Sequence, residues 1–210
     1  MTNENILTFF SKVFYTKKLN INCEKFVKNL KNLKYIEAGN RDNLDVENIT
    51  STSMSYKVLE SKNFLELKYL ILKEFNFFKN NYLFYTNNDF NITSSWVAKS
   101  TKNQSSNYHC HKNSFYSGII YLQTDKNCGG VSFENYYNTN NFLIIPSKYN
   151  LYNANQYTIN VENGLLLFFP SEIHHKVLKN NSDIDRYSVA FNIMPSGKIG
   201  VSDSAIEIKI

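Results

Sequence analysis

The feature that most constrains this chain is a change of hydrophobic periodicity near residue 90. Beyond that point, short runs of β-forming residues alternate with turn residues such as Asn163-Gly164. Short strands at this spacing are typical of antiparallel sandwiches and jelly rolls. The predicted strands cover residues 92–98, 117–123, 131–133, 142–145, 157–161, 165–169, 176–178 and 187–193. We therefore predict an all-β core with flanking helices, built as a jelly roll.

The first third of the chain has helical periodicity instead. Residues Glu24 to Leu33 place apolar side chains at helical spacing, and a stronger helix is expected with Ser61 as its N-cap. Residues 6–15 fit a strand or short helix, and the polar stretch 38–55 is predicted to be a loop. The expected organisation is a single domain: a helical support region at about 1–90, the jelly-roll core at about 91–195, and a C-terminal tail at 196–210.

Composition narrows the class of protein. A length of 210 residues suits one domain, and 42% hydrophobic content excludes a disordered chain. The charge of +5 comes from dispersed lysines, and the densest group is best explained as a solvated helix face, which argues against nucleic acid as a partner. Three widely separated cysteines and no signal-like or membrane-spanning segment predict an intracellular, cytoplasmic protein. The sequence does not specify the oligomeric state.

All four histidines fall into two short motifs, His109-Cys110-His111 and His174-His175. On a strand, His109 and His111 would point to the same face, whereas the adjacent His174 and His175 would point to opposite faces, so one of these two is expected to bind. Imidazoles that converge from two distant segments are typical of a mononuclear metal site. Fe, Ni, Cu and Zn all suit such ligands, and open coordination positions on a jelly roll favour Fe(II).

A polar strand face follows the second histidine motif. In the run 186–192, Arg186 and Ser188 share one face, and Tyr187, Val189 and Phe191 share the other. The planar fork of an arginine binds a carboxylate through two hydrogen bonds, and a neighbouring hydroxyl can add a third. We interpret Arg186 and Ser188 as an anion site inside the barrel. The alternative is a surface arginine paired with a nearby aspartate.

Together these segments resemble the 2-oxoglutarate and Fe(II)-dependent oxygenase superfamily, and more narrowly a His-x-His group found in bacteria and their viruses. The resembling pieces run in order from Ser95-Trp96 through the His-x-His motif, the strand 117–122, Gly129-Gly130 and 163–171, to His175 and 186–192. They cover about the C-terminal half of the chain. The resemblance implies a double-stranded β-helix, cupin-like core and the cofactors Fe(II) and 2-oxoglutarate.

The resemblance also implies roles for individual residues. His109 and His175 correspond to the two iron-binding histidines, and Arg186, assisted by Ser188, to the site of the distal carboxylate of 2-oxoglutarate. Tyr121 is a further candidate for that co-substrate. His111 stands where the superfamily usually has Asp or Glu; it is kept as the third ligand, with Asp183, Asp185 and Glu134 as carboxylate alternatives.

The implied activity is that of a dioxygenase, a hydroxylase that couples oxidative decarboxylation of 2-oxoglutarate by O2 to oxidation of a second substrate. Two other functions fit the same residues. A three-histidine cupin dioxygenase would bind its substrate directly to the metal without 2-oxoglutarate, and a non-catalytic jelly-roll module would only capture a ligand. The sequence does not identify the primary substrate.

Overall fold

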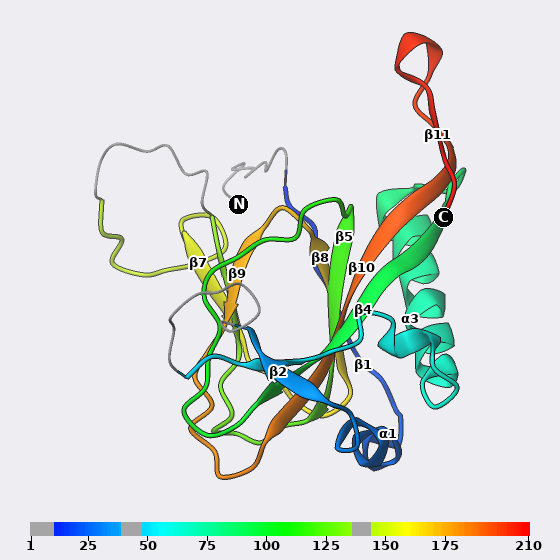
Figure 1. Ribbon diagram of the computed structural model, residues 1–210. Coiled ribbons are helices and arrows are strands. Elements are labelled where there is room, and N and C mark those ends of the chain that lie inside the picture. The colour runs from blue at the N-terminus through cyan, green and yellow to red at the C-terminus, as the bar shows by residue number, and fades with distance from the viewer. Residues whose placement is uncertain (1–10, 39–47, 136–143) are drawn as a thin grey trace.

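The computed structural model describes residues 11–38, 48–135 and 144–210, which form two antiparallel sheets with helices on one side (Figure 1). The larger sheet has the order β1-β8-β5-β10-β4-β3-β2, with β11 paired to β10, and the smaller has the order β7-β6-β9. The strands are β1 (Tyr15–Lys18), β2 (Tyr35–Glu37), β3 (Ser51–Ser53), β4 (Asp89–Ser100), β5 (Tyr116–Gln123), β6 (Val131–Glu134), β7 (Gln156–Ile159), β8 (Leu165–Pro170), β9 (His174–Val177), β10 (Arg186–Ile199) and β11 (Ile206–Ile208). The predicted jelly roll is confirmed.

Most predicted strands are found at their expected positions, and β4 to β10 correspond to seven of the eight predicted runs. The eighth run, 142–145, lies partly outside the described residues, and Ile144 and Ile145 are not in a strand. Residues 6–10 and 39–47 of the other predicted segments also lie outside them. The expected loop at 38–55 was wrong where β3 forms, because that short polar segment pairs with the edge of β4.

The two main helices are α1 (Cys23–Leu30) and α3 (Leu65–Phe78). Asn22 caps α1 by accepting a hydrogen bond from the backbone N–H of Lys25 at 3.2 Å. Ser61 does not cap α3, contrary to the sequence prediction. A short 3-10 turn, Val58–Glu60, precedes it, and α3 begins only after Phe64, whose side chain makes no capping hydrogen bond.

The N-terminal third is not purely helical, since it also supplies β1, β2 and β3 to the larger sheet. The helices cover the outer face of this sheet, where Phe75 and Phe78 of α3 belong to the same apolar cluster as Tyr187, Val189 and Phe191 of β10. A second apolar cluster fills the space between the two sheets and includes Tyr121, Phe133, Phe169 and Ala190. Strand β10 therefore has one face toward the helices and the other toward the barrel interior, as its alternating sequence predicts.

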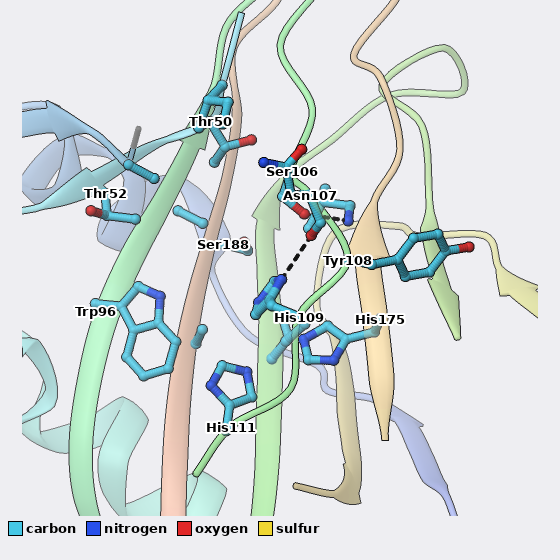
Figure 2. A pocket seen from close by; sticks show the side chains of 16 residues that line it. Thr50, Thr52, Trp96, Ser106, Asn107, Tyr108, His109, His111, His175 and Ser188 are labelled. Carbon is cyan, nitrogen blue, oxygen red and sulfur yellow. Dashed lines mark hydrogen bonds between the residues drawn. The ribbon is translucent and has the colours of Figure 1, made fainter. Parts of the chain in front are cut away.

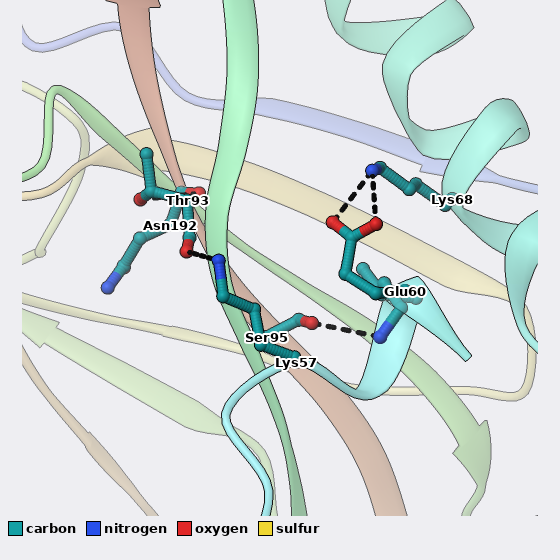
Figure 3. Close-up of polar contacts among 7 residues, drawn as sticks. Lys57, Glu60, Lys68, Thr93, Ser95 and Asn192 are labelled. Carbon is teal, nitrogen blue, oxygen red and sulfur yellow. Dashed lines mark hydrogen bonds and ion pairs between the residues drawn. The ribbon is translucent and has the colours of Figure 1, made fainter. Parts of the chain in front are cut away.

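Polar contacts hold the segment before α3 against β4 (Figure 3). The Ser95 hydroxyl accepts a hydrogen bond from the backbone N–H of Leu59 at 2.9 Å, and the Lys57 ammonium donates to the Thr93 carbonyl at 2.9 Å. These bonds fix β4 at the point where its next residue, Trp96, enters the barrel interior. No helix in the described ranges has the length and apolarity needed to span a membrane.

Candidate metal centre

The His-x-His motif lies on the connection between β4 and β5 rather than on a strand, which corrects the sequence prediction. The backbone of His109 forms a single antiparallel bridge with His175 of β9, through hydrogen bonds of 3.0 and 2.9 Å. The N–H of His111 donates to the Ser171 carbonyl at 2.9 Å, which anchors the loop a second time. These isolated backbone hydrogen bonds hold the motif in an extended conformation only at the points of contact.

The structure brings His109, His111 and His175 together at one end of the barrel interior (Figure 2). One ligand nitrogen from each residue lies within 4.8 Å of the other two. Their ring centroids are separated by 4.4 Å for His109 and His175, and by 5.3 and 5.1 Å for the pairs that involve His111. Three imidazoles at this spacing can bind one transition-metal ion.

Backbone carbonyls orient two of the three rings. The Nδ1 of His109 lies 2.9 Å from the carbonyl of Asn107, and the Nδ1 of His175 lies 3.0 Å from the carbonyl of Ile173. A carbonyl can only accept, so each Nδ1 carries the proton and each Nε2 keeps its lone pair. A hydrogen bond from the ring nitrogen that does not bind the metal is how proteins fix the tautomer of a metal-binding histidine.

Burial keeps the cluster uncharged. It lowers the pKa of His175 to about 2 and the pKa of His111 to about 4, and the neighbouring imidazoles lower both pKa values further. Both rings are therefore neutral near pH 7. Neutral imidazole is the form that binds a metal, so the cluster is ready for a cation without first losing protons.

These lowered pKa values predict that the metal-free protein is acid-sensitive. Between pH 6.5 and 5, His111 and His175 become protonated in the unfolded chain but stay neutral in the folded protein. The free energy of unfolding therefore falls as the pH falls. The loss over this range is about 2 kcal/mol for each of His111 and His175. Urea unfolding of metal-free protein at several pH values measures it, and the same slope in His111→Gln protein would contradict the assignment.

The carboxylates considered as alternatives to His111 are placed elsewhere. Asp183 pairs with Lys102 at 2.6 Å, and Asp185 pairs with Lys99 at 3.2 Å. Glu134 lines a separate cavity together with His174, whose side chain leaves β9 on the side opposite His175. Within the described ranges, the group that converges on one point contains histidines alone.

A cavity of about 470 Å³ opens beside the three histidines. Trp96 forms one wall, with its ring centroid 5.4 Å from that of His111, and Thr50, Thr52 and Ser188 add hydroxyl groups (Figure 2). Trp96 and the threonines were not predicted as site residues. The alternation of Trp96 and Ala98 along β4 could have indicated their shared face, but the pairing of β3 with β4 that brings Thr52 there could not be read from the sequence.

Arg186 lies on β10 two residues before Ser188, which lines this cavity, and is only 2% exposed. Its guanidinium donates to the carbonyls of Cys128 and Leu178 and, at 2.8 Å, to the Ser100 hydroxyl. The Ser100 hydroxyl lies 2.8 Å from that of Thr50, which reaches the cavity wall. No ion pair joins Arg186 to a carboxylate in the described part of the chain, so the surface-arginine alternative is wrong. A buried cation without a counter-ion is costly, and an anionic ligand would offset that cost.

The register of the sheet gathers the other predicted co-substrate residues beside Arg186. Ser188 lies directly opposite Tyr121 of β5, and both point into the barrel interior. The Tyr121 hydroxyl is fully buried and has no hydrogen-bond partner among the described residues. Burial raises its pKa, while the positive charge of Arg186 opposes that rise. An unpaired buried donor beside a buried cation fits a carboxylate ligand.

Sequence and structure comparisons agree with this geometry. Residues 94–192 match the family described as "Putative 2OG-Fe(II) oxygenase". Among solved structures, a Pseudomonas putida prolyl-4-hydroxylase is similar at 14% identity and TM-score 0.55, covering 85% of this chain and 91% of that one. HygX from Streptomyces hygroscopicus, solved with nickel, 2-oxoglutarate and hygromycin B, is similar at 13% identity and TM-score 0.56, covering 86% and 82%.

A Trichoplax adhaerens prolyl hydroxylase in complex with a hypoxia inducible factor peptide is similar at 15% identity and TM-score 0.59, with coverage of 86% and 82%. No curated protein sequence matches the chain. Identities this low show the fold alone, whereas the family match spans the His-x-His loop, His175 and Arg186 in one segment. Residues 94–192, just under half of the chain, are thus similar to the putative 2OG-Fe(II) oxygenases.

Proposed function

We propose that this enzyme hydroxylates its primary substrate with Fe(II) held by His109, His111 and His175. The observation that supports the ligand set is the convergence of three neutral imidazoles with two Nε2 atoms left free by backbone contacts. The group of donors fits a divalent transition metal. Bound iron would supply the redox chemistry that couples decarboxylation of 2-oxoglutarate to substrate oxidation.

The chain's own residues would position the co-substrate. Arg186 would bind the distal carboxylate of 2-oxoglutarate, with Ser188 and the unpaired hydroxyl of Tyr121 as further donors. Burial would strengthen these contacts, because little water competes for the carboxylate there. Trp96 and the apolar wall of the cavity would exclude water from the space beside the histidines.

A test of this function begins with purified protein reconstituted with Fe(II). We expect O2-dependent conversion of 2-oxoglutarate to succinate, slow without the primary substrate, and binding of 2-oxoglutarate to the Mn(II)-loaded protein by calorimetry. Oxygen consumption that needs iron but no 2-oxoglutarate would instead favour the three-histidine cupin dioxygenase. Absence of binding and turnover would overturn the proposal.

Tyr121→Phe gives a sharper prediction for the co-substrate site. The substitution removes a hydroxyl that has no partner among the described residues, so the free energy of unfolding should stay the same or rise. The same change removes one hydrogen bond to a bound carboxylate, and the dissociation constant for 2-oxoglutarate should rise about 10- to 100-fold. Calorimetry on Mn(II)-loaded protein measures it.

Tyr116→Phe is the matched control, because Tyr116 lies on the same strand but donates its hydroxyl to the Val13 carbonyl on the helix-covered side. This variant should bind 2-oxoglutarate normally. A Tyr121→Phe protein whose affinity stays within about twofold of the starting protein, a difference of under 1 kcal/mol, would remove Tyr121 from the site.

A further inference from the structure

The C-terminal hairpin extends away from the body of the molecule. Strand β10 continues past the end of its pairing with β5 at Ile193, and β11 folds back along residues 197–199 after a short turn. Figure 1 shows this arm projecting beyond the barrel and the helices. The predicted tail at 196–210 therefore contains two paired strand segments. This arm is separate from the metal centre described above.

One edge of β11 is available for pairing. The strand is hydrogen-bonded to β10 along one edge, and the other edge has no strand partner in the described part of the chain. Ile206 of this strand is 56% exposed and Ile210, just beyond it, is 59% exposed, while Ile208 is half-buried. An exposed apolar edge strand readily pairs with another strand, and natural proteins usually block such pairing with charge.

Here the charges favour a specific partner. Residues 206–210 read Ile-Glu-Ile-Lys-Ile, with the two charges of opposite sign placed symmetrically about Ile208. We propose that β11 pairs antiparallel with β11 of a second copy of this chain, centred on Ile208. Glu207 of each copy then lies opposite Lys209 of the other, and Ile206 lies opposite Ile210.

The charge pattern selects this register over its neighbours. A shift by two residues in one direction would place Glu207 opposite Glu207, and in the other direction Lys209 opposite Lys209. A shift by one residue would set isoleucines opposite charges and put the apolar side chains on different faces. Opposite charges directly across a strand pair stabilise it and like charges destabilise it, so one alignment is favoured.

The same alignment extends the pattern already present in the hairpin. Within one copy, Lys198 lies opposite Glu207 and Ile199 lies opposite Ile206. Pairing with a second copy would place Glu207 between Lys198 and the other copy's Lys209, and would continue the isoleucine row from Ile199. The two arms would form a four-stranded sheet with one apolar face and one face of alternating charge.

Sedimentation of the full chain tests this pairing, since a monomer has a mass of 24.5 kDa. We expect a concentration-dependent dimer of twice that mass. Glu207→Lys and Lys209→Glu should each raise the dimer dissociation constant at least about tenfold, because each substitution creates like-charge pairs. An equal mixture of the two variants should form heterodimers. The triple variant K198E/E207K/K209E reverses the charges across the hairpin as well as across the dimer, and it should dimerise like the starting protein.

Lys62→Glu, at an exposed position near α3, is the matched charge control and should not change the dimer. Circular dichroism of each variant shows whether the fold is kept. A full chain that stays monomeric at about 100 μM, on the order expected of weak edge pairing, overturns the proposal. Dimers that survive both single substitutions, or a mixture that stays monomeric, overturn it as well.

Discussion

His175→Ala should abolish turnover and lower the affinity for Mn(II) or Fe(II) by at least about 100-fold, because loss of even an outer contact to a metal ligand costs about 10- to 100-fold. His175 is central to the cluster: its ring lies 4.4 Å from that of His109 and 5.1 Å from that of His111. It is also the most buried of the three histidines. Calorimetric metal titration and succinate formation measure the two effects.

His174→Ala is the matched control, since it removes an imidazole from the adjacent position of the same strand. The side chain of His174 lines the other cavity, so metal affinity and turnover should stay within about threefold of the starting protein, a change of under 1 kcal/mol. The ligand assignment fails if the two variants behave alike. Equal loss in both would indicate that β9 matters for folding rather than for metal binding.

The second large effect is expected for Arg186→Met. This substitution keeps much of the side-chain volume but removes the buried cation, and the dissociation constant for 2-oxoglutarate should rise at least about 100-fold, as for other truncated buried charge pairs. Metal affinity should be unchanged, because Arg186 is outside the histidine cluster. The carbonyls of Cys128 and Leu178 lose their donor, so the free energy of unfolding should fall by about 1–3 kcal/mol.

Lys99→Met is the control for this variant. Lys99 is a cation on the strand next to Arg186, but its ammonium pairs with Asp185 at 3.2 Å outside the barrel interior. Its loss should leave 2-oxoglutarate binding unchanged. If Arg186→Met also binds 2-oxoglutarate normally while remaining folded, the anion site is elsewhere and the buried arginine is structural.

The strands of the core were predictable because their periodicity is a local property. In 186–192, alternation alone assigns Val189 to the helix-covered face and Ser188 to the interior, and the structure agrees. Convergence of the histidines was also predictable, since histidines grouped in two motifs on separate segments are typical of a shared metal ion. The prediction for His109 and His111 was wrong about their secondary structure. They converge on one point, but the local extended backbone comes from a single bridge to β9 rather than from a strand.

Long-range pairing accounts for most of what the sequence did not predict. Segment 51–53 is polar and short, and it forms strand β3 because it pairs with the edge of β4. The same pairing brings Thr52 to the cavity wall. Ser61 has the right side chain for an N-cap, but it directly follows a 3-10 turn, and α3 begins only at Leu65. In each case tertiary contacts override local preference.

The position of Trp96 has a practical consequence. It is the single tryptophan in 210 residues, and its ring lies 5.4 Å from His111. All indole fluorescence from this protein therefore originates beside the three histidines. Emission excited at the red edge of protein absorbance can follow occupancy of the cavity in real time, without a label and without knowledge of the primary substrate.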